Sequence, residues 1–164
     1  MLVEISGVCQ YCAEQVKVLM MDGEPVGNCT SCDETPFGSK TVKGVIYVVA
    51  NKNQIGVKVG LTTKHIDQRV KALSSTGVPG RFEKIAIFPS DRPEADEKKV
   101  HEKLARHRLE KEHFDLDPVE AVLKAHRALN YREPIFFDEK LRERFNLLKE
   151  RGNIEMKLKL SKQR

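Results

Sequence analysis

The stretch GVIYVVANKNQIGVKVGLTTKHIDQRVKAL, residues 44–73, decides the fold of most of this chain. Its first part, residues 44–50 (GVIYVVA), is a continuous apolar run and predicts a strand that is buried on both faces. Residues 55–61 (IGVKVGL) predict an antiparallel partner strand, because only the short polar turn NKNQ separates the two runs. Tyr47 and Lys58 stand within these strands, although apolar packing requires neither a phenol nor an ammonium there.

The remaining pattern predicts one more strand and four helices. The strand is expected at residues 82–88 (FEKIAIF), and the helices at residues 64–74, 92–108, 118–129 and 140–151. Thr62 or Thr63 can cap the first of these helices. Together the elements predict an α+β fold, in which a three-stranded antiparallel sheet is flanked by helices.

All four cysteines fall in the first 32 residues, as the pairs CQYC and CTSC. Two C-x2-C pairs with 16 residues between them are typical of a zinc site with four thiolate ligands, here Cys9, Cys12, Cys29 and Cys32. An Asp-Gly pair at residues 22–23 predicts a hairpin between them. Two disulfides or a redox pair would use the same residues, but the cytosol rarely keeps disulfides. Residues 1–39 are therefore predicted to be a small amino-terminal zinc-ribbon module that depends on structural Zn²⁺ for its stability.

Residues 33–44 (DETPFGSKTVKG) concentrate Pro, Gly, Ser and Thr and predict a linker after the cysteine module. We predict a main domain over residues 43–130 and a basic helical C-terminal extension over residues 131–164. No run approaches the roughly 18 apolar residues that a membrane span requires. The N-terminus MLVEISGV lacks the features of a signal peptide, so we expect a cytoplasmic protein with no membrane partner.

Charge is unevenly distributed along the chain. Residues 1–40 hold 2 Lys or Arg against 6 Asp or Glu, whereas the remainder holds 27 against 18. A domain with such a basic excess attracts polyanions, of which nucleic acid is the commonest, but a solvated surface with a basic bias explains the same numbers. The acidic cysteine module is not expected to bind a phosphate backbone. Contact with a protein partner, reading of a groove edge and bracing of the next domain stay open for it.

Several residues, in this order, resemble the GIY-YIG nuclease superfamily. The resemblance rests on Val45-Ile46-Tyr47 after Gly44, Lys58-Val59-Gly60, Arg69, the loop STGVP, the helix pair Glu97 and His101, and Glu112-His113-Phe114. A phage-associated branch of that superfamily is similar in having K-I-G or K-V-G in place of Y-I-G. The resemblance spans residues 43–117. It implies the sheet described above, a metal-dependent DNA endonuclease activity, and a bacterial or phage-infected cell.

The resemblance also implies roles for three residues in hydrolysis of a phosphodiester. Tyr47 is the expected general base or water-positioning group, and as a base it needs nearby positive charge. Arg69 is expected to grip two phosphate oxygens and to stay charged in the transition state. Glu97 is the expected ligand of one catalytic Mg²⁺ or Mn²⁺ ion. A core tyrosine, a surface arginine and a surface carboxylate are the ordinary alternatives.

Two further residues are expected to support catalysis. Lys58 stands where the superfamily has its second tyrosine, and it can bind phosphate, lower the pKa of Tyr47, or be an exposed residue on an edge strand. His101 lies one helical turn after Glu97 and can orient that carboxylate or protonate the leaving group. Gly60 is expected to permit a close approach of backbone or substrate, or to mark a bulge.

Other basic residues are candidates for contact with the DNA backbone: Lys64, His65, Lys71, Arg106, Arg108 and Lys111. The sequence contains no recognisable recognition helix and few aromatic residues, so it does not indicate whether the target is branched, modified or ordinary duplex DNA. Replacement of the second tyrosine keeps two other functions open. One is a GIY-YIG-like DNA-binding module that does not cleave, and the other is a zinc-ribbon adaptor for protein partners.

Overall fold

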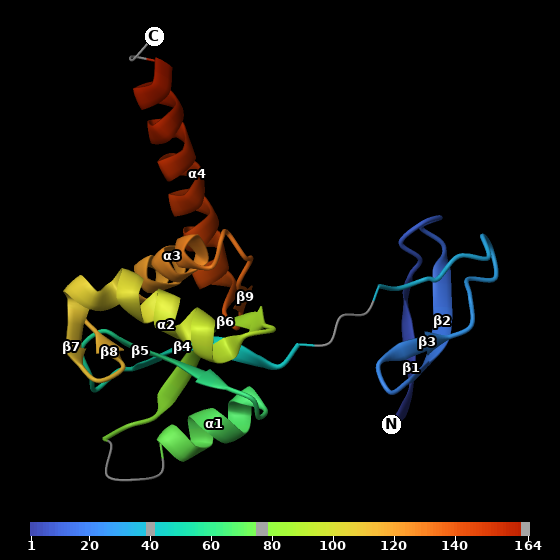
Figure 1. Ribbon diagram of the computed structural model, residues 1–164, viewed down its shortest axis with the longest axis horizontal. Helices are drawn as coiled ribbons and strands as arrows, with labels where there is room; N and C mark the ends of the chain where they lie inside the picture. The colour runs from blue at the N-terminus through green and yellow to red at the C-terminus, as the bar shows by residue number, and fades with distance from the viewer. Residues whose placement is uncertain (39–41, 75–78, 162–164) are drawn as a thin grey trace. The chain divides into compact units, whose positions relative to one another are not determined.

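The computed structural model describes residues 1–38, 42–74 and 79–161 (Figure 1). The chain divides into two compact units, Met1–Thr41 and Val42–Arg164, each with its own sheet. Most of the STGVP loop, part of the predicted linker and the last three residues of the chain lie outside the described residues.

The first unit is a three-stranded antiparallel sheet in the order β1-β2-β3. Its strands are β1 (Leu2–Val8), β2 (Gln15–Met21) and β3 (Glu24–Val26). Asp22 and Gly23 form the turn between β2 and β3, with φ angles of 50° and 94°. Both residues therefore adopt the left-handed conformation that a tight two-residue hairpin turn requires, and the hairpin predicted from the Asp-Gly pair is present.

The two faces of this small sheet differ in burial. Along β2, alternate side chains pack around the cysteines: Val16, Val18 and Met20. The opposite face leaves five apolar side chains exposed: Leu2, Val8, Leu19, Met21 and Val26. The apolar core of this unit is therefore limited to a few side chains around the cysteines, which is little for a segment of this length.

The second unit has a six-stranded sheet in the order β7-β8-β5-β4-β6-β9. Its long strands are β4 (Gly44–Asn51), β5 (Val57–Thr62) and β6 (Phe82–Ser90), and β4 pairs with both others in antiparallel fashion. These are the three strands that the sequence predicts, so the α+β class and the three-stranded antiparallel sheet are confirmed. Short strands extend this sheet at its edges: β7 (Arg108–Glu110), β8 (His113–Phe114) and β9 (Ile135–Phe136).

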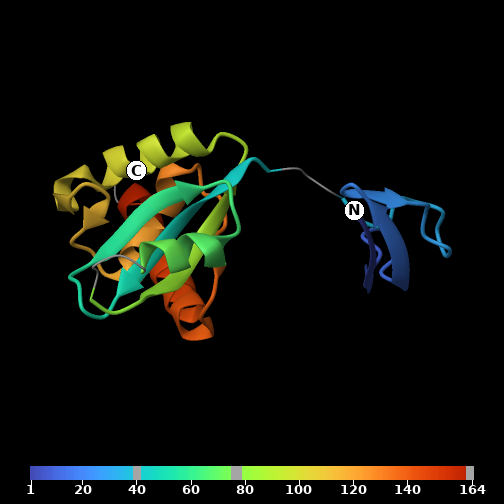
Figure 2. The same ribbon diagram turned by 90° about the horizontal axis from the view of Figure 1, so that it is seen from below.

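Helices cover both faces of the larger sheet (Figure 2). They are α1 (Ile66–Leu73), α2 (Pro93–Leu104), α3 (Pro118–Ala128) and α4 (Glu139–Ser161), with a short 3-10 helix, η1 (Ala105–His107), after α2. Side chains alternate along β4. Ile46 and Val48 join a large core with residues of α2 and α3, whereas Tyr47 and Val49 join a smaller core with α1.

Helix α1 begins later than the sequence predicts. The cap expected at Thr62 or Thr63 is wrong, because Thr62 ends β5 and its Oγ1 accepts a hydrogen bond from the backbone N–H of Lys64 at 3.0 Å. The N-cap is His65, whose Nδ1 accepts a hydrogen bond from the backbone N–H of Asp67 at 3.2 Å. Imidazole is outside the usual set of capping side chains, so residue preference pointed to the threonines.

The C-terminal helix α4 is longer than predicted and contributes to the large core. It continues past the expected end at residue 151 to Ser161. Phe145 is only 1% exposed, and its ring packs edge-on against His126 of α3 with 5.4 Å between centroids. No helix in the described ranges is both long enough and apolar enough to span a membrane.

A buried ion pair ties the start of α2 to two other segments. Asp96 Oδ2 accepts hydrogen bonds from Ser90 Oγ and from Arg132 Nη1, each at 2.7 Å, and the Asp96 side chain is 4% exposed. Arg132 Nη1 also donates to the carbonyl oxygen of Pro89 at 2.8 Å. Burial opposes ionisation of Asp96, but these donors outweigh it and hold the pKa of Asp96 below its usual value.

Candidate active site

The ring of Tyr47 lies directly against Gly60. The two residues are partners in the antiparallel register of β4 and β5, and Tyr47 is 0% exposed. A Cβ atom added at Gly60 would lie 2.4 Å from Oη and 2.7 Å from Cζ of Tyr47, which is far inside contact distance. The close approach expected at Gly60 is therefore made by the phenol of Tyr47, and the register with β5 is continuous at this point.

Arg69 of α1 contacts the same phenol. Its Nε donates a hydrogen bond to Oη of Tyr47 at 3.2 Å, and its guanidinium carbon lies 5.7 Å from the centroid of the ring. Both the oxygen and the face of the ring attract the guanidinium. The structure thus brings together two of the residues that the sequence singled out, although they are 22 residues apart in the chain.

The surroundings of Tyr47 do not favour loss of its proton. Burial raises the pKa of the phenol above its ordinary value, and the negative charges of Glu112 and Glu97 raise it further. The hydrogen bond and the charge of Arg69 act in the opposite direction without reversing the shift. The cation that favours the phenolate is therefore Arg69 and not Lys58, which the sequence suggested.

Lys58 forms an ion pair with Glu112. It stands opposite Val49 of β4 in the register, so its side chain lies on the same face of the sheet as Tyr47. Lys58 Nζ lies 2.5 Å from Oε2 of Glu112, and the two side chains are 13% and 35% exposed. Burial opposes ionisation of Glu112, but the hydrogen bond and charge of Lys58 outweigh it and hold the pKa of Glu112 below its usual value.

Glu97 of α2 belongs to the same group of charges. Burial raises the pKa of its half-buried carboxyl group, and the negative charge of Glu112 adds to the rise. The charge of His101, a hydrogen bond to the backbone of Leu61 and the charge of Arg69 all favour the ionised form. The carboxylate is therefore within electrostatic reach of both the other carboxylate and the guanidinium.

His101 is held in place by the backbone of β5 and by an aromatic ring. Its Nε2 lies 2.9 Å from the carbonyl oxygen of Val59, and because a carbonyl oxygen only accepts hydrogen bonds, Nε2 is the donor. The imidazole centroid lies 5.3 Å from that of Phe114. These contacts fix His101 one helical turn after Glu97, so the structure brings these two candidates together as well.

An open groove of about 470 Å³ lies beside Arg69. The end of β5 and one side of α1 line it, and its polar lining includes Lys64, Gln68 and Arg69. Arg69 connects this groove to the buried Tyr47. A ligand in the groove could therefore contact the guanidinium.

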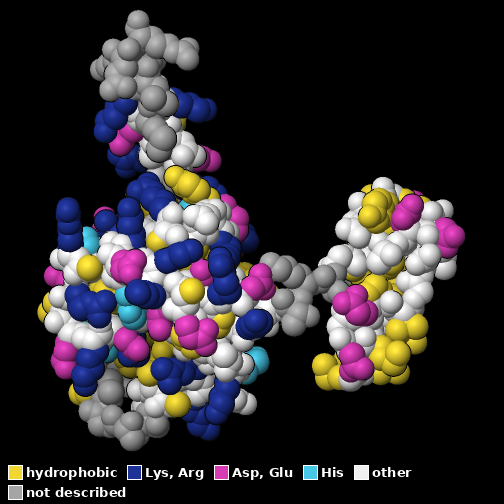
Figure 3. Space-filling view, in the orientation of Figure 1, with side chains coloured by type: hydrophobic (Ala, Val, Ile, Leu, Met, Phe, Trp, Pro, Cys, Tyr) yellow, Lys and Arg dark blue, Asp and Glu magenta, His cyan; other side chains and the backbone are white. Residues whose placement is uncertain are grey.

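The structure divides the other basic candidates between separate regions. Lys64 lines the groove beside Arg69, whereas the exposed His65 caps α1. Lys71 lines a different hollow on the other side of α1, together with Arg81. In Figure 3, Lys and Arg side chains are spread over the visible face of the second unit, while the first unit shows mainly apolar and acidic side chains.

The remaining three basic candidates lie around the short strand β7: Arg106, Arg108 and Lys111. All three are exposed. The guanidinium of Arg108 donates to the carbonyl oxygen of Lys111 and lies 5.2 Å from the ring centroid of Phe114. Lys111 has a φ angle of 48° and forms the turn that leads to Glu112.

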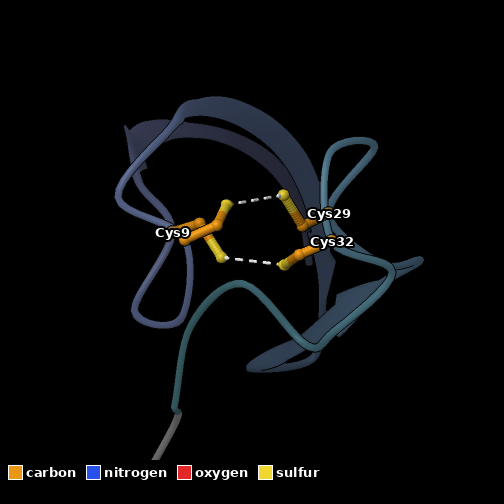
Figure 4. A group of neighbouring side chains, drawn as sticks. Cys9, Cys29 and Cys32 are labelled. Atoms are coloured by element: carbon orange, nitrogen blue, oxygen red, sulfur yellow. Dashed lines mark hydrogen bonds between the residues drawn. The ribbon is translucent and has the colours of Figure 1, made fainter.

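The four cysteines form a second candidate site in the first unit (Figure 4). Their Sγ atoms all lie within 4.8 Å of one another, and the distances Cys9–Cys32 and Cys12–Cys29 are both 3.7 Å. A disulfide bond measures about 2.05 Å, whereas four sulfurs in a tetrahedron around Zn²⁺ lie about 3.8 Å apart at Zn–S distances of about 2.3 Å. The cluster therefore fits a zinc ion. Among the described residues, no other group of three or more His, Cys, Asp or Glu ligand atoms gathers in this way.

The two C-x2-C turns have matching backbones. The N–H of Cys9 donates to the carbonyl of Glu14, and the N–H of Cys29 donates to that of Glu34, both at 2.9 Å. Hydrogen bonds from the backbone of Ser31 and Cys32 lower the pKa of the Cys29 thiol to about 7. In the same turn, a backbone hydrogen bond at Glu34 lowers the pKa of Cys32, but burial and the neighbouring thiols outweigh it and raise that pKa to about 12. The thiolate is the form that binds a metal, so Cys29 is better prepared as a ligand than Cys32.

The pairing of Lys58 with Glu112 was missed in the sequence. Glu112 lies in the turn directly before β8, a strand of only two residues that leaves no periodic signal. The available signal was the run EHF at residues 112–114, in which Phe114 is buried. Because Phe114 is buried against the sheet, the position of Glu112, two residues earlier, is fixed relative to the sheet as well.

The guanidinium, the buried phenol and the carboxylates thus lie beside one sheet of an α+β domain. The model of the T5orf172 domain family matches residues 44–130, which is more than half of the chain. The chain therefore belongs to the T5orf172 domain family, a nuclease-like family. Neither the comparison with curated proteins nor that with solved structures found a match.

Proposed function

We propose that the second unit is a metal-dependent DNA endonuclease of the GIY-YIG type, which hydrolyses phosphodiester bonds. The observation that carries the proposal is the placement of Arg69. Its guanidinium lines an open groove, is held by the buried Tyr47, and lies within electrostatic reach of Glu97. A fixed guanidinium is well suited to two phosphate oxygens, and membership in a nuclease-like family supports the same chemistry.

In this proposal Tyr47 positions other groups and is not the general base. The phenol is fully buried and its pKa is raised, so it keeps its proton at neutral pH. Its Oη holds Arg69 through the 3.2 Å hydrogen bond and thereby fixes the cation that meets the phosphate. Removal of the hydroxyl should therefore act through Arg69.

Glu97 is the residue that would hold Mg²⁺ or Mn²⁺. A half-buried carboxylate with a raised pKa gains from a neighbouring cation, and both ions prefer oxygen ligands and keep several waters. The bound ion would offset charge on the phosphate and favour ionisation of water. His101, which favours the ionised form of Glu97, supports this role.

The first unit is proposed to bind structural Zn²⁺ through its four cysteines, on the basis of their mutual distances. Thiols at 3.7 Å that are not joined as disulfides are also what a cytoplasmic location predicts. We propose the division 1–39, 43–130 and 131–164 for the chain. The boundary of the two units at residues 41 and 42 supports the first division, and the end of the family match at residue 130 supports the second, within a compact unit whose core also includes Phe145.

The test is cleavage of supercoiled plasmid by the zinc-loaded protein with Mg²⁺ or Mn²⁺. Glu97→Ala should reduce nicking by about 100-fold or more, because it removes the proposed metal ligand. Glu94→Ala is the matched control, since Glu94 is an exposed carboxylate in the first turn of the same helix. Equal nicking by wild type and Glu97→Ala would remove Glu97 from the proposal.

A second function, DNA binding without cleavage, is favoured by one observation. Lys58, which stands in place of the second tyrosine, has no hydroxyl group and is engaged in an ion pair with Glu112. This alternative predicts salt-sensitive DNA binding and no nicking with either metal ion. The plasmid assay and a binding titration on the same preparation separate the two functions.

A further inference from the structure

We propose that Glu112 is a positioning residue of the candidate site: its ion pair holds the ammonium of Lys58 at a fixed place on the Tyr47 face of the sheet, where Lys58 binds a phosphate of the DNA backbone. The inference rests on the proposed nuclease function. Glu112 is assigned no contact with the substrate and acts through Lys58.

The backbone of Glu112 is anchored to the strand that carries Lys58. Its carbonyl oxygen accepts a hydrogen bond from the N–H of Val59 at 3.0 Å. The next residue, His113, is the register partner of Lys58 between β5 and β8. Phe114 follows in the large core at 0% exposure. The position of the carboxylate is therefore set by the sheet and not by a free loop.

The pair is more buried than an ordinary surface ion pair. The Lys58 side chain is 13% exposed, whereas that of Lys52, which pairs with Glu83 on the same sheet, is 83% exposed. Lys149, paired with Glu133, is 33% exposed. A largely buried ammonium needs a counter-charge. Without Glu112, the flexible side chain of Lys58 would move toward water.

Lys58 and Arg69 belong to one electrostatic group. The ionised form of Glu112 is stabilised by Lys58 first, and then by His101 and Arg69. Lys58 approaches the Tyr47 face from β5, and Arg69 approaches it from α1. Two fixed cations beside one buried phenol suit neighbouring phosphate oxygens, and a fixed cation contributes more to catalysis than a mobile one.

A double-mutant cycle tests the inference with the full zinc-loaded chain. Plasmid nicking with Mn²⁺ is measured for wild type, Glu112→Gln, Lys58→Met and the double variant. Each single substitution is expected to lower the rate by about tenfold, because a displaced contact costs about that much. The double variant should lose no more than about twofold beyond Lys58→Met, since Glu112 acts only through Lys58. A purely structural role of Glu112 would lower the rate again in the Lys58→Met background.

Glu83→Gln is the matched control, because it breaks an exposed Lys–Glu pair of the same sheet, and it should nick at the wild-type rate. The inference is overturned if the rate loss of the double variant equals the product of the two single losses. It is also overturned if Glu112→Gln nicks at the same rate as Glu83→Gln. Either outcome leaves the nuclease function standing. If wild type does not nick, the nuclease function fails, and the same cycle is measured as the dissociation constant for a short DNA duplex. Non-additive loss of binding then supports the inference, and additive loss or absence of binding overturns it.

Discussion

At the scale of single residues, the ring of Tyr47 fills the space that a side chain at position 60 would occupy. The need for glycine here is steric, because the phenol oxygen lies 2.4 Å from the place of a Cβ atom. Gly23 is different: its φ angle of 94° is the reason for glycine, and nothing lies within 4 Å of its Cβ position. The glycine of the Lys58-Val59-Gly60 motif is therefore required by the tyrosine of the Val45-Ile46-Tyr47 motif.

Gly60→Ala is expected to lower the free energy of unfolding by about 1–3 kcal/mol, because the added methyl group must displace the buried ring. Urea unfolding of the zinc-loaded chain measures the change. Gly38→Ala is the control, since its Cβ would lie 3.7 Å from the nearest atom, and it should change the stability by less than about 0.5 kcal/mol. Equal effects of the two substitutions would mean that the ring moves aside freely.

At the scale of elements, the ion pair of Asp96 and Arg132 joins segments that the family match separates. Asp96 lies in α2 inside the matched range, whereas Arg132 lies just beyond its end at residue 130. Phe145 of α4, also beyond the matched range, packs in the large core together with residues of α2 and α3. Residues beyond the matched range thus contribute to the core and to the placement of α2, which carries Glu97 and His101.

Arg132→Gln is expected to lower the stability at pH 7 by about 2–3 kcal/mol, because it leaves a buried carboxylate without its charged partner. The pKa of Asp96 is lowered in the folded protein, so the ion pair stabilises the fold above the ordinary value of 3.8 and ceases to do so as the pH falls through the folded value. The difference between wild type and variant should therefore shrink toward acid pH.

Urea unfolding at several pH values between neutral and acid measures this difference. Arg142→Gln is the control, because it removes an exposed i,i+3 partner of Glu139 in α4 and should have little effect. A difference between wild type and Arg132→Gln that is constant with pH would contradict the assignment to Asp96.

At the scale of the whole molecule, the two units depend on different sources of stability. The second unit has two apolar cores on either side of its sheet, whereas the first has a small cluster around four cysteines. A unit with so little apolar core is expected to owe its fold to the metal, as small zinc domains do. The second unit contains none of the cysteines and has no such dependence.

Removal of zinc with a selective chelator should unfold the first unit and leave the second folded. Amide NMR signals of residues 1–38 should lose their dispersion, while those of residues 42–74 and 79–161 keep theirs. Cys32→Ser should have the same effect without a chelator, since it removes one of the four sulfurs. Retention of dispersed signals in both units after chelation would show that the first unit folds without metal.

The sequence predicted the long elements but not the pairing of the short strands with the sheet, for physical reasons. Continuous apolar runs mark β4 and β5, but β8 has two residues, and no period can be read from two. The strand pattern drew attention to Tyr47, and resemblance supplied the expected roles of Tyr47, Arg69, Glu97 and His101. The structure brings these four together, and their roles stay predictions. The partner of Lys58 depends on a contact between residues far apart in the chain, which the local pattern does not reveal. The N-cap of α1 was missed because imidazole is an unusual acceptor at that position.

The ring of Tyr47 occupies the space that a side chain at position 60 would need, so substitutions at the two positions are expected to be coupled in evolution. A change at position 60 alone creates overlap, and a change to a smaller residue at position 47 alone creates a cavity. Only a paired change preserves the packing, so descendants of such a chain are expected to keep both residues or to lose both. In a relative, a bulky residue at position 60 would therefore indicate that the first motif has also lost its phenol.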